Sequence, residues 1–240
     1  MSSDDNNEQG LIYHLEELRK TLLDCIFSLF YFFIPIFLFS NKILNLFVDY
    51  LIQNTGIVFN YFSPTEVFLL QIKLAFIIDL IICFPYIARR LWSFILPALY
   101  ENEKKFVRNA IISSCSFFLL GIIFCITVFL PLVVKFGVSF ISDNIQAVFG
   151  ISNVINLSFW LMLSFGLMFQ FPIIVYYLLK SQIIDIQSIR HKRPYVIVSL
   201  LIFAAILTPP DIISQLIMFI PSYLLFEGGL IFASLKLKGR

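Results

Sequence analysis

Long apolar segments alternate with short polar connections along the whole chain. Apolar runs with few or no charges cover residues 23–41, 67–88, 109–134, 157–179, 195–208 and 213–233. A helix needs about 20 such residues to cross a hydrocarbon core roughly 30 Å thick, and most of these runs approach that length. The pattern therefore predicts an all-α membrane protein, in which six transmembrane helices form a single domain over residues 1–240.

The segment before the first span has a different pattern. Leucines recur at helical spacing between residues 11 and 22, and the other side of the expected helix is polar. Glu17 lies on that polar side, with Arg19 and Lys20 close by. This arrangement predicts an amphipathic helix that lies at the membrane surface.

The last two spans are short. The fifth run ends at Thr208-Pro209-Pro210-Asp211, where two prolines interrupt any helix. A helix over residues 195–208 reaches only about 21 Å, well below the thickness of the hydrocarbon core. We expect the fifth and sixth helices to thin the bilayer locally or to lie against partner proteins.

Composition and charge support the membrane interpretation. The chain is 60% apolar and 13% charged, with a mean hydropathy of +0.92, whereas soluble domains are about a quarter charged. Fourteen of the 17 lysines and arginines fall on one side of the six-span arrangement. The positive-inside rule places that side, with both termini, in the cytoplasm. The net charge of +2 gives no reason to expect a nucleic-acid partner.

Several polar side chains fall within the apolar spans. Lys73 and Asp79 lie in the second span, Gln170 in the fourth and Glu227 in the sixth. Such groups are costly in lipid and normally face protein or water. Lys73 can pair with Glu66 two turns away or extend to the near interface. Gln170 either forms a hydrogen bond between helices or lies in a substrate pathway.

The sequence shows no pattern typical of an enzyme. Its two histidines lack the spacing of a zinc protease, and no nucleophile elbow or phosphate-binding loop occurs. The four cysteines form no Cys-x-x-Cys pair and are interpreted as small buried hydrophobes. We therefore predict no cofactor and no metal. A transporter for a small solute or an ion is the alternative, although no internal repeat with paired broken helices is visible.

The connection over residues 89–106 is the longest polar segment between two spans on the basic side. It combines basic residues with four aromatic ones, Trp92, Phe94, Tyr100 and Phe106. One interpretation is a solvated loop whose aromatic residues anchor it at the bilayer interface. The other is an aromatic groove, with Glu101 and Glu103 at its mouth, that receives a cationic and partly apolar peptide.

Five short motifs occur in order along the chain. They are His14-Leu15-Glu16-Glu17-Leu18-Arg19-Lys20, Ser63-Pro64-Thr65-Glu66, Trp92-x-Phe94-Ile95-x-Pro97-Ala98-Leu99-Tyr100-x-x-Glu103, Lys192-Arg193-Pro194-Tyr195 and Thr208-Pro209-Pro210-Asp211-x-x-Ser214-Gln215. Together they closely resemble the TatC family, the multispanning receptor of the twin-arginine, or Sec-independent, protein translocase. The resemblance extends from Leu11 to Glu227.

The resemblance implies a glove-shaped bundle of six helices with cytoplasmic termini. It also implies a cytoplasmic site for the Arg-Arg signal peptides of folded cargo. The residues that match the family's site are Glu17, Arg19, Phe94, Leu99, Tyr100 and Glu103.

The same resemblance implies partners. TatA-like and TatB-like single-span proteins are expected to dock on the fifth and sixth helices, which include Thr208 and Gln215. Transport is expected to use the proton-motive force and no nucleotide, and the receptor is expected to self-associate among membrane lipids. Asp211 is expected to cap the sixth helix, and a role in the transport pathway is the alternative. The expected location is the inner (plasma) membrane of a bacterium, or else an organelle membrane of bacterial descent.

The chain departs from the family pattern at two places. The fourth span often carries a glutamate where this chain has Gln170, which retains hydrogen bonding without an ionisable group. The first loop on the far side usually contains a proline in its short helix, and the segment 48–51 has none.

Overall fold

The structure, a computed structural model, describes residues 4–57, 59–95, 104–139, 149–181, 184–207 and 212–238. These residues are almost entirely helical, which confirms the predicted all-α fold. The helices are α1 (Asp4–Leu38), α2 (Ser40–Thr55), α3 (Pro64–Ile95), α4 (Lys104–Phe124), the π-helix η1 (Cys125–Phe129), α5 (Leu130–Ser139), α6 (Ile151–Met168), α7 (Phe171–Lys180), α8 (Ile186–His191), α9 (Arg193–Leu207) and α10 (Ile212–Lys238).

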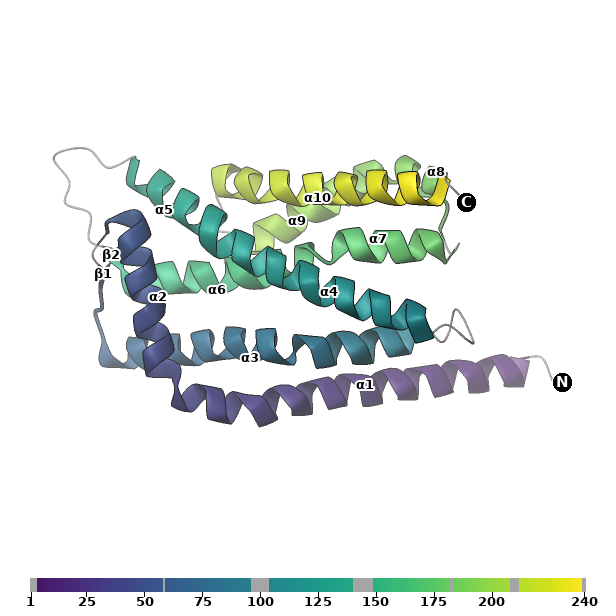
Figure 1. Cartoon of the computed structure of the whole chain (residues 1–240), viewed down its shortest axis with the longest axis horizontal. Coiled ribbons are helices and arrows are strands. Elements are labelled where there is room, and N and C mark those ends of the chain that lie inside the picture. The colour runs from purple at the N-terminus through teal and green to yellow at the C-terminus, as the bar shows by residue number, and fades with distance from the viewer. Residues whose placement is uncertain are drawn as a thin grey trace.

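Most helices run lengthwise in one elongated bundle, and α2 lies across one end of it (Figure 1). Within the described residues, five helical segments are long and apolar enough to cross a membrane, and Arg193–Ile206 forms a shorter apolar helix. Large apolar side chains cover the outside, for example Phe30 and Ile206, which are 69% and 74% exposed. An outer surface of this kind is stable in lipid and not in water. The chain is therefore a multi-pass membrane protein.

The N-terminal segment differs from the expectation of a separate surface helix. Residues 11–22 and the first span belong to one continuous helix, α1, of 35 residues. No glycine or proline lies between Leu11 and Ile34, so nothing in the sequence ends the helix there. At about 1.5 Å per residue α1 is roughly 52 Å long, which exceeds the hydrocarbon core. Its amphipathic first turns therefore extend beyond the core along the same axis. The helix ends at Leu38, one turn after Pro35.

The far end of the bundle contains more regular structure than the first far-side loop expected between the first two spans. Helix α2 occupies most of that segment and ends at Gly56, whose left-handed backbone (φ 70°) lets its N–H bond the carbonyl of Ile52. The strand β1 (Phe59–Asn60) then pairs in parallel with β2 (Phe149–Gly150). Leu51 of α2 is fully buried in the largest apolar core cluster. The segment without the family's usual proline lies inside an uninterrupted helix.

The fourth span is broken where the sequence places Gln170 before Pro172. Helix α6 ends at Met168 and α7 begins at Phe171, with the proline in its first turn. The two helices together form the apolar segment Ile151–Lys180. Residues of α6, including Leu161, Phe165 and Met168, belong to the core cluster that also contains residues of α3, η1 and α10.

The last two helices differ in length. Helix α9 has 15 residues, and at 1.5 Å per residue it reaches roughly 22 Å, as short as predicted. Helix α10 has 27 residues and extends beyond the predicted span at both ends. Its apolar membrane segment, Met218–Lys236, has 19 residues and is the shortest of the five long segments in the described part of the chain.

Candidate functional site

Helices α1 and α3 run antiparallel, which brings the first turns of α1 to the last turns of α3 (Figure 1). Glu17 and Arg19 are exposed on α1 at this end of the bundle. An ion pair between Asp24 of α1 and Arg90 of α3, at 3.0 Å, joins the two helices below them. The Arg90 Nε also donates to the hydroxyl of Tyr86, at 3.1 Å. Arg90 is therefore engaged with protein groups.

Trp92 anchors the end of α3 to α4. Its side chain is only 9% exposed, and its Nε1–H donates to the hydroxyl of Ser114 at 2.8 Å. The indole also packs on Tyr177 of α7, with ring centroids 5.1 Å apart. Phe106 of α4 meets the same tyrosine edge-on at 4.8 Å. Both residues are thus buried in a cluster that joins α3, α4 and α7. Neither is the exposed interface anchor that one interpretation expected.

This aromatic cluster fixes both ends of the connection between α3 and α4. Phe94 follows Trp92 by two residues and is half-buried at the end of α3. Leu99, Tyr100 and Glu103 lie outside the described residues. Of the six residues expected in the signal-peptide site, the structure therefore places Glu17, Arg19 and Phe94 at one end of the bundle. The clustering of Trp92, Phe106 and Tyr177 could not be inferred from sequence spacing.

The acidic and basic groups of the second span do not pair with each other. Glu66 Oε2 accepts the backbone N–H of Phe62 at 3.0 Å and of Ser63 at 3.3 Å. The motif Ser63-Pro64-Thr65-Glu66 therefore closes the start of α3, as a capping box does. Lys73 instead donates to the side-chain oxygen of Asn156 on α6. Lys73 therefore neither pairs with Glu66 nor extends to the interface, which were the two alternatives expected from the sequence.

Asp79 and Gln170 face the protein interior. Asp79 is fully buried, and one of its oxygens accepts from the Cys83 thiol at 3.4 Å. Gln170 Nε2 donates to the carbonyl of Ser114 at 3.2 Å. This bond joins the break between α6 and α7 to α4, as the first of the two interpretations of Gln170 predicted. A role in a substrate pathway stays a prediction.

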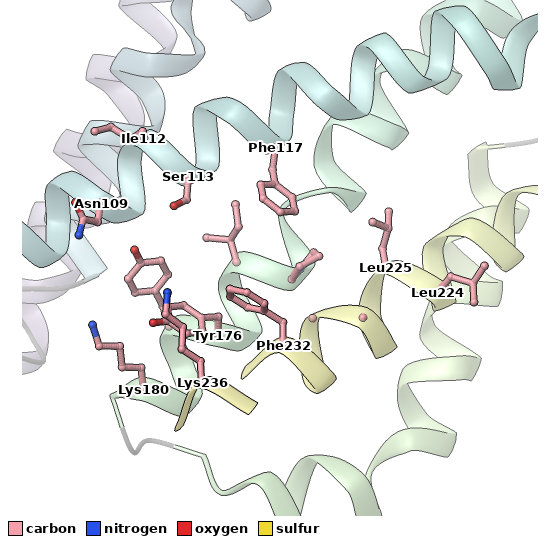
Figure 2. Close-up of a pocket in the computed structure, with 15 residues that line it drawn as sticks. Asn109, Ile112, Ser113, Phe117, Tyr176, Lys180, Leu224, Leu225, Phe232 and Lys236 are labelled. Carbon is pink, nitrogen blue, oxygen red and sulfur yellow. The ribbon is translucent and has the colours of Figure 1, made fainter. Parts of the chain in front are cut away.

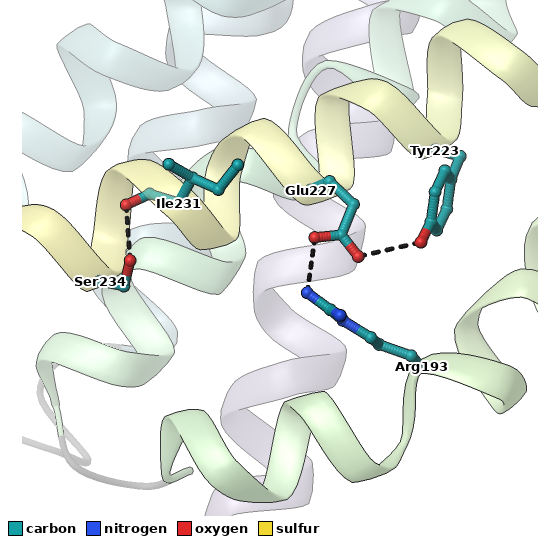
Figure 3. A network of polar contacts seen from close by, with 5 residues as sticks. All are labelled: Arg193, Tyr223, Glu227, Ile231 and Ser234. Atoms are coloured by element: carbon teal, nitrogen blue, oxygen red, sulfur yellow. Dashed lines mark hydrogen bonds and ion pairs between the residues drawn. The ribbon is translucent and has the colours of Figure 1, made fainter.

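Arg193, at the start of α9, reaches Glu227 of α10, and the two form an ion pair at 2.8 Å (Figure 3). The hydroxyl of Tyr223 donates to the other oxygen of the same carboxylate at 3.0 Å. This pair could not be inferred from the sequence, because its two residues are 34 positions apart in the chain.

Gln215 also makes a contact within the chain. Its Nε2 donates to the carbonyl of Leu201 on α9 at 3.0 Å. The amide expected to meet a partner helix therefore also holds α9 against α10. Thr208 and Asp211 lie outside the described residues, so the docking and capping roles expected of them stay predictions.

The arrangement is that of a helical multi-pass membrane protein with a polar, acid-containing face at its basic end. The family model for the Sec-independent protein translocase protein (TatC) matches residues 13–221. The chain is 36% identical over 238 residues to the "Sec-independent protein translocase protein TatC" of Escherichia coli strain K12, covering 97% of this chain and 91% of that protein. Identity to TatCy of Bacillus subtilis strain 168 is 31% over 222 residues, covering 92% and 87% of the two chains.

A solved structure is also similar. The crystal structure of the twin-arginine translocase receptor TatC in DDM superposes with a TM-score of 0.83 at 30% sequence identity, covering 92% of this chain and 99% of that one. The chain belongs to the TatC family.

Proposed function

We propose that this chain is the receptor subunit of a twin-arginine protein translocase. The observation that carries the proposal is the match to the family over residues 13–221, with a solved receptor of the same fold. The exposed carboxylate of Glu17, beside the end of α3 that bears Phe94, supplies the chemistry that such a receptor needs.

The recognition step follows from the chemistry of the two arginines. Each guanidinium can donate paired hydrogen bonds to a carboxylate. Glu17 on α1 and Glu103 in the connection before α4 are the proposed acceptors, and Leu99 and Tyr100 belong to the same connection. Phe94 offers apolar contact to the part of the peptide that approaches the bilayer. Arg19 and the neighbouring basic residues repel cations that are not held by these acids.

The scaffold below the site favours a preorganised surface. The Asp24–Arg90 ion pair joins α1 to α3, and the cluster around Trp92 joins α3 to α4 and α7. Because these contacts hold the helix ends that carry Glu17 and Phe94, little ordering is needed when a peptide binds. Preorganisation of this kind lowers the entropic cost of association.

Single-span partners are proposed to dock on α9 and α10. A row of exposed apolar side chains at helical spacing runs along α9: Tyr195, Val198, Ile202 and Ile206. A helix only about 22 Å long leaves part of the bilayer unmatched. A partner helix of the TatA or TatB kind, placed against this row, would cover the mismatch. Transport is proposed to use the proton-motive force, and copies of the chain are proposed to associate.

The proposed location is the bacterial inner membrane, with both termini in the cytoplasm. Lysines and arginines near the start of α4, the end of α7 and the end of α10 gather at the same end of the bundle as the N-terminus (Figure 1). A small-solute transporter is not favoured, because Lys73, Gln170 and Glu227 each bond to another helix.

Binding of a labelled twin-arginine signal peptide to the purified chain in lipid nanodiscs tests the proposal. A peptide in which Lys-Lys replaces Arg-Arg is the control, since lysine retains the charge without the paired bonds. We expect binding to fall on the order of 10- to 100-fold with the control peptide. Equal affinity for both peptides would exclude a receptor that reads the arginine pair.

A further inference from the structure

The ion pair between α1 and α3 has the chemistry that a receptor for arginine needs. Arg90 Nη2 lies 3.0 Å from Asp24 Oδ2, so a guanidinium of the chain itself is bound to a carboxylate. The side chains of Arg90 and Asp24 are 45% and 29% exposed, which leaves both within reach of a polar ligand. Asp24 is therefore an acid, besides Glu17 and Glu103, that can bind an arginine.

Asp24 lies on the same face of α1 as Glu17. Glu17 precedes it by seven positions, which is two helical turns, or about 10.5 Å along the axis. Because α1 and α3 are antiparallel, the pairing of Asp24 with Arg90 places Glu17 near the end of α3, which bears Phe94. Adjacent Cα atoms in an extended peptide are about 3.8 Å apart. Two long arginine side chains make up the remaining distance between the two acids.

The cavity between α4, α7 and α10 does not suit an arginine pair. Its volume is about 690 Å³, and none of the described residues that line it is acidic. Lys236 lies at one end of the cavity, and Leu224 and Leu225 lie at the other (Figure 2). A cationic peptide would meet like charge at the polar end and no carboxylate to accept its hydrogen bonds. The seam between α1 and α3, which carries Glu17 and Asp24, suits the peptide arginines better.

Arg90 has a second partner on its own helix. Its Nε donates to the hydroxyl of Tyr86 at 3.1 Å. Its Cζ lies 5.4 Å from the centroid of the same ring, which is a cation–π contact. Arg90 therefore keeps favourable contacts when it leaves Asp24, and the exchange of one guanidinium for another on that carboxylate costs little.

Loss of the ion pair would not separate α1 from α3. The Cys83 thiol of α3 donates to the backbone carbonyl of Ser28 on α1 at 3.7 Å. Further along, Phe37 of α1 meets Phe68 of α3 edge-on, with ring centroids 5.9 Å apart. The two helices thus stay packed while the charged pair at their cytoplasmic end is exchanged.

We propose that Arg90 occupies Asp24 in place of a signal-peptide arginine and is displaced when the peptide binds. One peptide arginine then binds Asp24, and Glu17 and Glu103 remain acceptors for the other. A peptide arginine can donate two parallel hydrogen bonds to the carboxylate, and a lysine cannot. Because Arg90 must be replaced, weaker cations are held back. This inference rests on the receptor function proposed above.

The test measures the affinity of a labelled twin-arginine peptide for the full chain in lipid nanodiscs by fluorescence anisotropy. Arg90→Gln removes the internal competitor and should tighten binding about fivefold. Asp24→Asn removes the acceptor and should weaken binding about threefold. The double variant Asp24→Asn/Arg90→Gln should bind as Asp24→Asn does, since Arg90 competes for Asp24 alone. A purely structural ion pair would instead shift both single variants in the same direction.

Two further variants separate competition from net charge. Arg89→Gln removes one positive charge from the adjacent, exposed position of α3. The fivefold effect is therefore taken as the difference between Arg90→Gln and Arg89→Gln. Arg90→Lys keeps the charge but loses the paired hydrogen bonds, so it should tighten binding by about twofold. Thermal unfolding of each variant verifies the fold, and a loss of stability cannot by itself tighten binding.

Two results would overturn this proposal and leave the receptor function in place. The first is a chain that still prefers the Arg-Arg peptide to the Lys-Lys peptide, with Arg90→Gln binding no more tightly than Arg89→Gln. The second is a gain from Arg90→Gln that persists undiminished when Asp24 is already Asn. Equal wild-type affinity for the two peptides would overturn the receptor function and this proposal with it.

Discussion

Ser114 takes part in two hydrogen bonds that join three parts of the bundle. Its hydroxyl accepts from Trp92 on α3, and its backbone carbonyl accepts from Gln170 at the break between α6 and α7. The serine is almost fully buried on α4. A continuous polar path therefore runs from the helix end below the candidate peptide site to the centre of the bundle. Buried networks of this kind rigidify a fold when each group has a partner.

The indole N–H of Trp92 is expected to stabilise this junction. Trp92→Phe keeps an aromatic ring but removes the donor to Ser114, which should lower the free energy of unfolding by about 0.5–1.5 kcal/mol. Thermal or denaturant unfolding in detergent measures the change. Trp160→Phe is the matched control, since Trp160 is the chain's other tryptophan and is 47% exposed. Equal destabilisation by the two variants would mean that the hydrogen bond contributes nothing specific.

Glu17 and Glu103 are expected to bind the arginines of the signal peptide. Removing one acceptor of charge-assisted bonds, as in Glu17→Ala or Glu103→Ala, should weaken peptide binding on the order of 10- to 100-fold. Glu103→Asp should do less harm. Glu16→Ala is the control, because Glu16 is equally exposed on the adjacent position of α1. A double-mutant cycle against the peptide arginines measures the coupling. Purely additive losses would show that these acids only support the surface.

For single residues, the sequence predicts which polar groups are exposed better than it predicts which residues they contact. The exposed position of Glu17 follows from the polar side of the leucine pattern in α1. The partners of Lys73, Trp92 and Glu227 do not follow, since each lies on a helix far along the chain. Helix periodicity gives the direction of a side chain on its own helix, and only the packing of helices decides which group it meets.

At the element scale, α9 and α10 are held together by polar contacts at two levels. Arg193 and Glu227 pair near the basic end, and Gln215 bonds the Leu201 carbonyl further along. Inside a lipid bilayer, burial of apolar surface does not drive helices together. Close packing and hydrogen bonds between helices are therefore the main attractions. The surface proposed for partner docking therefore depends on contacts within the chain.

Gln215→Leu is expected to act at this surface. The change removes the donor to Leu201 and any polar contact to a partner, with a cost of about 0.5–2 kcal/mol. We expect crosslinks between α10 and a single-span partner to weaken or move, while the chain remains folded. Ser116→Leu is the control, because Ser116 is exposed on α4, away from α9 and α10 in the chain, and bonds to the carbonyl of Ile112 on its own helix. Unchanged crosslinks along the whole of α10 would remove the docking hypothesis.

Two element boundaries follow from a residue that ends a helix, although Pro35, Pro85 and Pro221 lie inside continuous helices. Pro172 accounts for the break after α6, and the glycine at position 56 accounts for the end of α2. The amphipathic segment was expected to be a separate helix, yet no such residue divides it from the first span. A change in hydrophobic pattern marks where a helix leaves the hydrocarbon core, and it does not by itself end the helix.

At the scale of the whole molecule, basic residues and chain termini share one end of the bundle. The start of α1, the start of α4, the end of α7 and the end of α10 lie together, whereas α2 and the two strands lie at the other end (Figure 1). The number of apolar membrane helices and the gathering of basic residues at one end were predictable, because both depend on composition along the chain. That this end lies in the cytoplasm stays a prediction. The tilt of α4 and the crosswise position of α2 depend on packing and were not.

The orientation of the bundle in the membrane can be tested by thiol labelling. Single cysteines placed at Asn102 and Ser188 should react with a membrane-impermeant thiol reagent from the cytoplasmic side, because basic residues flank both positions. Cysteines at Asn54 and Asn144 should react from the opposite side. Ser188 and Asn54 are exposed on α8 and at the end of α2, so reagent access does not limit either of them.

The parent chain is the control for this labelling. Its own cysteines lie in helices at membrane depth, and Cys25, Cys83 and Cys125 are buried, so they should react slowly. Labelling of Asn54 and Asn102 from the same side would contradict a six-span arrangement. An inverted pattern, with Asn54 reacting from the cytoplasm, would place Glu17 and Phe94 on the far side of the membrane. No cytoplasmic signal peptide could then reach them, and the proposed receptor site would be excluded.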